Sequence, residues 1–238
     1  MQFNFLKEYA PAEADILLWF GKWTFRNILA RIFAGAQFFH VSMLSATPSK
    51  GIYYNYEQNM DMVSETPRPI HELLANSSYK QLVLRPKFEE MKVEICKGPG
   101  FKRRAHNFVR DMPTPKHITS AMKEVVWFRY NNIDVIRAVF NKYRKASKIV
   151  GCCLDKEGVE FLYYFKENRL STKDWVLSVD KRNTFTCSGA VATAFALNGI
   201  QLFDKLPWFV LPDDFVKCRY FSRIGCINSS TKILYQNN

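Results

Sequence analysis

The sequence has few histidines and lacks several motifs that would assign a function at once. Only four histidines occur among 238 residues, so there are few candidates for a general base. Neither a Gly-rich phosphate loop nor a Gly-x-Ser-x-Gly turn occurs, which argues against a P-loop nucleotide-binding protein and a serine α/β-hydrolase. No apolar run approaches the roughly 20 residues of a membrane span, so we expect no transmembrane segment.

The six cysteines lack the regular spacing of a disulfide framework, which favours a reduced interior. Cys152 and Cys153 are adjacent and do not have metal-ligand spacing, so we expect no metal and no cofactor. The first residues include Glu8 and contain no long apolar core, unlike a secretory signal. We therefore expect a soluble protein that is cytoplasmic or virion-associated.

What the chain has in excess is positive charge, with a formal net charge of +12. Such a charge attracts polyanions, which include nucleic acid, an anionic membrane surface and an anionic cell-wall polymer. Basic residues gather at 97–104 and 142–148, although either run could simply be a solvated face. Hydrophobic residues at 47% and charged residues at 24% are ordinary for a folded protein.

The hydrophobic pattern predicts alternating strands and helices. Residues 15–20 form a near-continuous apolar run, typical of a strand buried on both faces. In the strand 38–44, alternation places His40, Ser42 and Leu44 on one face and the intervening Phe39, Val41 and Met43 on the other. Further strands are predicted at 52–56, 60–65, 81–85 and within 220–234, and helices at 25–33, 69–75, 114–130 and 133–144.

These elements suggest one main domain with additions. We expect a leader at 1–14, a domain at 15–216 and a C-terminal extension at 217–238. Stretches near 87–113 and 146–182 interrupt the pattern and are interpreted as insertions.

The stretch 184–200 predicts a compact helix of small residues with Cys187 in its first turn. Unpaired N–H groups and the positive end of the helix dipole stabilise a thiolate there, which is the setting of a cysteine nucleophile. The alternative is a small buried core thiol. His40 also has two interpretations. A histidine among apolar strand residues needs a polar partner, and it is either a satisfied core residue or the base that such a thiol requires.

Taken in order, these segments resemble the circularly permuted NlpC-type papain-like hydrolases of the YiiX-like group. The likeness covers roughly residues 12–86 and 114–216. It rests first on an opening strand (Asp15-Ile16-Leu17-Leu18), a following helix (25–33) and a turn into a His-Val strand (Gly35 to Val41). An acidic strand (Val63-Ser64-Glu65), a Cys-Ser pair at a helix start (Cys187-Ser188) and a proline-acid segment (Leu211 to Phe215) complete the pattern.

The resemblance implies an α+β, permuted papain-like domain whose small antiparallel sheet packs against the nucleophile helix. Cys187 would be the nucleophile, His40 the base and Glu65 the residue that orients it. The backbone N–H of Cys187, with Gln37 as a candidate second donor, would form the oxyanion site. The expected activity is that of a thiol protease or amidase, a cysteine hydrolase that cleaves amide bonds in peptidoglycan peptides or related substrates.

Two other functions stay open. Permuted relatives also act on lipid amides or esters, as hydrolases or acyltransferases. The family usually has Glu after the Cys-Ser pair, whereas this chain has Gly189. That departure favours a non-catalytic alternative, a basic binding or structural protein of phage or viral type that keeps the fold.

Overall fold

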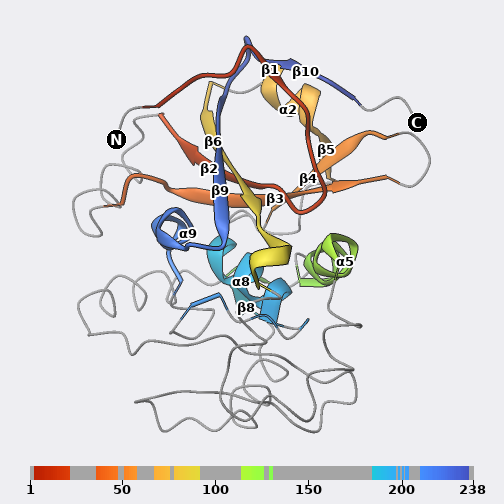
Figure 1. Cartoon of the computed structure of the whole chain (residues 1–238), viewed down its shortest axis with the longest axis vertical. Coiled ribbons are helices and arrows are strands. Elements are labelled where there is room, and N and C mark those ends of the chain that lie inside the picture. The colour runs from red at the N-terminus through yellow and green to blue at the C-terminus, as the bar shows by residue number, and fades with distance from the viewer. Residues whose placement is uncertain are drawn as a thin grey trace, which may run out of the picture.

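The fold is taken from a computed structural model (Figure 1). The structure describes residues 3–21, 36–47, 51–57, 67–75, 78–91, 114–125, 129–130, 184–196, 198, 200, 202–203 and 210–235. The predicted helices 25–33 and 133–144, the strand 60–65, the insertion 146–182 and most of the insertion 87–113 lie outside these residues. Within them, no helix is long and apolar enough to cross a membrane.

An antiparallel sheet of six strands forms the centre of the described structure. Its order is β5-β4-β3-β2-β6-β9, and every neighbouring pair is antiparallel. This confirms the prediction of an α+β fold built on a small antiparallel sheet. The strands are β2 (Ile16–Phe20), β3 (His40–Ala46), β4 (Tyr53–Glu57), β5 (Arg68–Pro69), β6 (Lys80–Pro86) and β9 (Phe221–Ile227).

All five residues of β2 are buried because a hydrophobic core lies on each face of the sheet. Ile16, Leu18 and Phe20 point into the larger core, together with α5 (Pro115–Val125) and α8 (Cys187–Ala196). Leu17 and Trp19 point into the smaller core, which α2 (Ile70–Ala75) covers. Figure 1 shows α5 and α8 on one side of the sheet and α2 on the other. Apolar residues along the whole of β2 are therefore required.

A strand near each end of the described chain lies on the side of the smaller core, β1 beside β10 (Figure 1). β1 (Glu8–Tyr9) pairs in parallel with β10 (Lys232–Ile233), and Tyr9 and Ile233 pack with this core. The sequence assigned residues 217–238 to an extension, but β9 within them is an edge strand of the main sheet, paired with β6. The pairing depends on contacts distant in sequence, which local patterns do not reveal.

Two local predictions differ from the structure. The helix that starts at Pro115 ends at Val125, not near Tyr130, because Arg129–Tyr130 form a strand (β7) in parallel with β8 (Thr184–Phe185). Phe39 packs with the smaller core, not with Val41 and Met43 in the larger one. Regular alternation applies only inside a strand, and β3 begins at His40.

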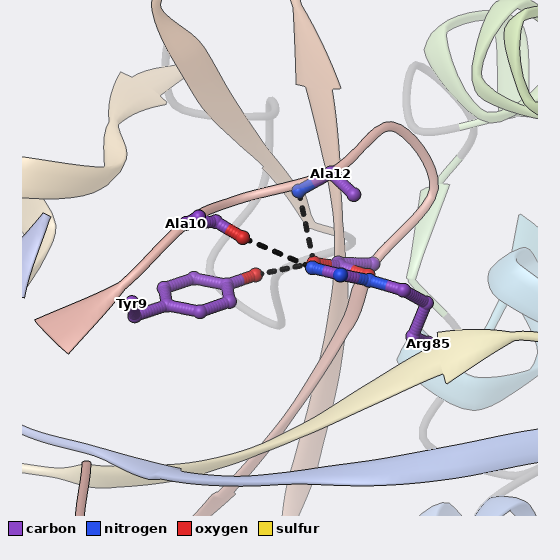
Figure 2. A network of polar contacts seen from close by, with 5 residues as sticks. Tyr9, Ala10, Ala12 and Arg85 are labelled. Carbon is purple, nitrogen blue, oxygen red and sulfur yellow. Dashed lines mark hydrogen bonds and ion pairs between the residues drawn. The ribbon is translucent and has the colours of Figure 1, made fainter. Parts of the chain in front are cut away.

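A buried polar network fixes the start of β2 (Figure 2). The Asp15 carboxylate accepts hydrogen bonds from Tyr9 Oη at 2.5 Å, from the Ala12 N–H at 3.0 Å and from Arg85 Nε and Nη2, both at 2.8 Å. Arg85 also donates to the Ala10 carbonyl at 3.0 Å. Asp15 is fully buried, and a buried carboxylate is tolerated only when paired in this way. The network ties residues of the predicted leader to β2 and β6.

Candidate active site

Cys187 is the first residue of α8, and Thr186 caps this helix. Thr186 Oγ1 accepts a hydrogen bond from the Gly189 N–H at 2.9 Å, and the Thr186 carbonyl accepts one from the Ala190 N–H at 2.8 Å. Threonine is a favoured cap because its hydroxyl satisfies an N–H that the helix leaves unpaired. The predicted helix start is confirmed, and it places the Cys187 thiol at the positive end of the helix dipole.

Three groups lower the pKa of the Cys187 thiol. Burial by itself raises this pKa, but the charge of His40, a hydrogen bond from its ring, and the backbone N–H groups of Val41 and Ser188 bring it below its ordinary value. The Cys187 residue is only 4% exposed, so these interactions are poorly screened by water. The structure therefore brings together Cys187 and His40, the two residues that the sequence singled out.

His40 stands between Cys187 and a carboxylate. Its Nε2 lies 2.9 Å from Glu57 Oε2, and the two side chains are 15% and 17% exposed. The Trp19 ring meets the imidazole edge-on, with the ring centroids 5.6 Å apart. Because Glu57 occupies Nε2, the other ring nitrogen is the one left to face the thiol.

The charges around His40 favour its protonated form. Burial by itself lowers the pKa of His40, but Cys187 and Glu57 raise it more, and the net pKa is about 10. With the thiol pKa lowered and the imidazole pKa raised, a thiolate–imidazolium pair is the favoured state between the two values. Such a pair is the activated form of a cysteine nucleophile.

The carboxylate in contact with His40 is that of Glu57, which the sequence analysis did not single out. Glu57 ends β4 and lies opposite Ser42 of β3, two residues along the strand from His40. The predicted strand 52–56 stopped one residue short of it. The predicted orienting residue, Glu65, lies outside the described residues, and the carboxylate at His40 Nε2 is that of Glu57.

Of the two predicted oxyanion donors, the structure gives a hydrogen-bond partner for the backbone of Gln37. The Gln37 backbone N–H donates to Asp213 Oδ1 at 2.9 Å, and the Phe38 N–H donates to Asp213 Oδ2 at 3.3 Å. Asp213 belongs to α9 (Pro212–Lys217), in the proline-acid segment that supported the family resemblance. The oxyanion roles of the Cys187 N–H and of Gln37 stay predictions.

Gly189 takes the third position of α8, where the hydrolases that the sequence resembles usually have Glu. An acid at this position commonly reaches back to the N–H of the capping residue. Here Gly189 and its neighbours in the first turn are buried, where a carboxylate without a partner would be costly. Thr186 still caps the helix, so the loss of the acid leaves Cys187 at the helix start.

The other described cysteines have different surroundings. Burial raises the pKa of both Cys218 and Cys226 to about 11. Cys218 is more exposed than Cys187, yet its thiol is the weaker acid. In the part of the chain that the structure describes, no group of three or more His, Cys, Asp or Glu side chains could hold a metal ion. Cys187 is therefore distinguished by its partners and not by exposure.

Comparison with models of known protein families finds no match, and comparison with curated proteins finds no relative.

Proposed function

We propose that this protein is a cysteine hydrolase that cleaves amide bonds through a covalent acyl-enzyme. The observation that carries the proposal is the sequence of contacts from Cys187 to His40 to Glu57. A thiol at a helix start, a base beside it and a carboxylate behind the base are the three parts that thiol hydrolysis requires. The permuted papain-like fold and the family resemblance belong to the same proposal.

The reaction has two halves. The Cys187 thiolate attacks the amide carbonyl carbon, and the tetrahedral intermediate collapses to a thioester as the C–N bond breaks and imidazolium His40 gives its proton to the leaving amine. Neutral His40 then takes a proton from water, which attacks the thioester and releases a carboxylic acid. Glu57 keeps the imidazole oriented and stabilises its charged form through both halves.

The resemblance and the charge suggest a substrate. Peptidoglycan peptides are the most frequent substrates of the related hydrolases, and a net charge of +12 would hold the enzyme on an anionic polymer. We therefore propose a peptide or wall-peptide amide as the natural substrate. Resolution of the thioester by water defines a hydrolase, and resolution by another nucleophile would define an acyltransferase.

Acylation by p-nitrophenyl acetate tests the proposal without knowledge of the substrate. We expect a burst of p-nitrophenolate close to one equivalent per chain, and an acetyl group on the peptide that contains Cys187. Cys187→Ala should abolish the burst, because burial raises the pKa of the other described thiols and leaves them protonated near neutral pH. Peptide mapping by mass spectrometry identifies the acetylated residue.

Cys218→Ala and Cys226→Ala are the matched controls, since each removes a described thiol whose pKa is raised to about 11. Both variants should keep the burst. A burst that persists in Cys187→Ala, or acetylation spread evenly over the cysteines, would refute the proposed hydrolase.

A further inference from the structure

A short segment of the chain, residues 210–213, contacts both halves of the candidate site. Ser188 Oγ, next to the nucleophile, donates to the Val210 carbonyl at 2.6 Å. At the other end of the segment, the two carboxylate oxygens of Asp213 accept the N–H groups of Gln37 and Phe38, at 2.9 and 3.3 Å. Those two residues precede His40, with only Phe39 between. The segment thus bridges the start of α8 and the entry to β3.

The segment is itself held in a fixed conformation. Pro212 restricts the backbone at the first residue of α9, and the Leu211 N–H donates to Asp214 Oδ2 at 2.7 Å. Val210 and Leu211 are buried. Because this segment is rigid, it can fix the start of α8 relative to the entry to β3, which a mobile surface loop cannot do.

The contact between Cys187 and His40 needs such a bridge. The two residues come from a helix and a strand that are far apart in the sequence, and reactive groups must be held to within about 0.5 Å of the productive geometry. Phe38 anchors one side of the His40 entry by burying its ring in the larger core. Its N–H and that of Gln37 are fixed by Asp213.

We propose that Asp213 is a positioning residue, which holds His40 against Cys187 by fixing the Gln37–Phe38 backbone to the segment that also contacts Ser188. This inference rests on the proposed function, because it explains how the same catalytic pair is kept in place. Asp213 touches neither reacting atom, so its effect passes through the backbone of the His40 strand.

Two neighbouring aspartates provide a matched test. Asp213→Asn leaves one acceptor oxygen for two N–H groups and places an amide N–H₂ against the other. Asp214→Asn removes the same charge from the same turn, but its remaining carbonyl oxygen can still accept the N–H of the cap residue Leu211, so the segment stays held. The measurement is the pH profile of Cys187 alkylation by iodoacetamide, followed by peptide mapping, with circular dichroism melting to check the fold.

Asp213→Asn should slow Cys187 alkylation near neutral pH by about tenfold or more, since small displacements of reacting groups have effects of this size or larger. The midpoint of the pH profile should move upward, because a displaced His40 no longer lowers the thiol pKa. The melting curve must show that the variant is folded at the assay temperature, because unfolded chains expose Cys187 as an ordinary thiol and would also move the midpoint. Asp213→Glu, which keeps two acceptor oxygens, should restore part of the rate, and Asp214→Asn should stay within about twofold of the wild type.

Ser188→Ala tests the other end of the bridge in case Asp213→Asn folds poorly. It should move the midpoint in the same direction, and the double variant should shift it less than the sum of the single shifts. Folded Asp213→Asn with the wild-type midpoint overturns the inference alone. The inference is also overturned if the midpoint shifts of Ser188→Ala and Asp213→Asn simply add in the double variant. It is overturned as well if Asp214→Asn moves the midpoint as far as Asp213→Asn does. If wild-type Cys187 alkylates no faster than Cys218, the proposed function fails and the inference fails with it.

Discussion

His40→Ala should reduce turnover by roughly a thousandfold or more, because loss of the base removes both the thiolate and the proton donor for the leaving group. The structure adds a second expectation. Without His40, the imidazolium would no longer lower the pKa of the Cys187 thiol. Burial would then raise this pKa, as it does for Cys218 and Cys226. The rate of Cys187 alkylation near neutral pH should therefore fall by at least about tenfold, because less of the thiol is ionised. A thiolate of higher pKa is intrinsically more nucleophilic, which offsets part of this loss.

His71→Ala is the control for this variant. His71 lies in α2, on the face of the sheet opposite α8, and its side chain is 48% exposed. It should leave turnover and Cys187 alkylation unchanged. Equal rates for His40→Ala and the wild type would show that Cys187 is an ordinary core thiol, the alternative that its burial in a helix of small residues allows.

Glu57→Gln should reduce turnover by about 10- to 100-fold. A hydrogen bond to a charged group contributes about 1.5–3 kcal/mol, and each 1.4 kcal/mol corresponds to a factor of ten in rate. Glutamine keeps the size of the side chain but not its charge, so the imidazolium loses a stabilising neighbour. The pKa of His40 should fall as a result, and the thiol pKa of Cys187 should rise with it.

A parallel variant, Glu65→Gln, tests which of the two glutamates orients His40, Glu57 as the geometry predicts or Glu65 as the family resemblance implies. The geometry predicts that Glu57→Gln shows the large loss, whereas the family pattern assigns the orienting role to Glu65. Glu90→Gln, a change to a carboxylate that is 60% exposed, controls for the loss of one negative charge. Activity lost in Glu65→Gln and kept in Glu57→Gln would return the orienting role to Glu65.

The features of the fold that are encoded locally were predictable from the sequence. The unbroken apolar run of β2 indicates a strand between two cores, and the small residues after Thr186 indicate a helix with Cys187 in its first turn. Both signals arise within a few residues, so neither depends on knowing what lies beside them. His40 was identifiable because a histidine among apolar strand residues requires a partner.

What the sequence could not provide is pairing between distant segments. Glu57 lies beside His40 because of the register of β3 with β4, which no local pattern specifies. The predicted strand ended one residue earlier, at Tyr56. Phe39 broke the expected alternation because it precedes the first regular residue of its strand. The contact of Asp213 with the Gln37–Phe38 backbone and the place of β9 at the sheet edge are likewise long-range results of folding.

The most direct test of the thiolate–imidazolium pair is the pH profile of alkylation of Cys187 and Cys218 in the same wild-type sample. The pKa of His40 is raised to about 10 and that of Cys187 is lowered, so the pair should be charged between the lowered thiol pKa and pH 10. Cys187 should gain its reactivity at a lower pH than an ordinary cysteine, while the more exposed Cys218 gains reactivity only toward pH 11. Two profiles that rise together above pH 9 would contradict the account.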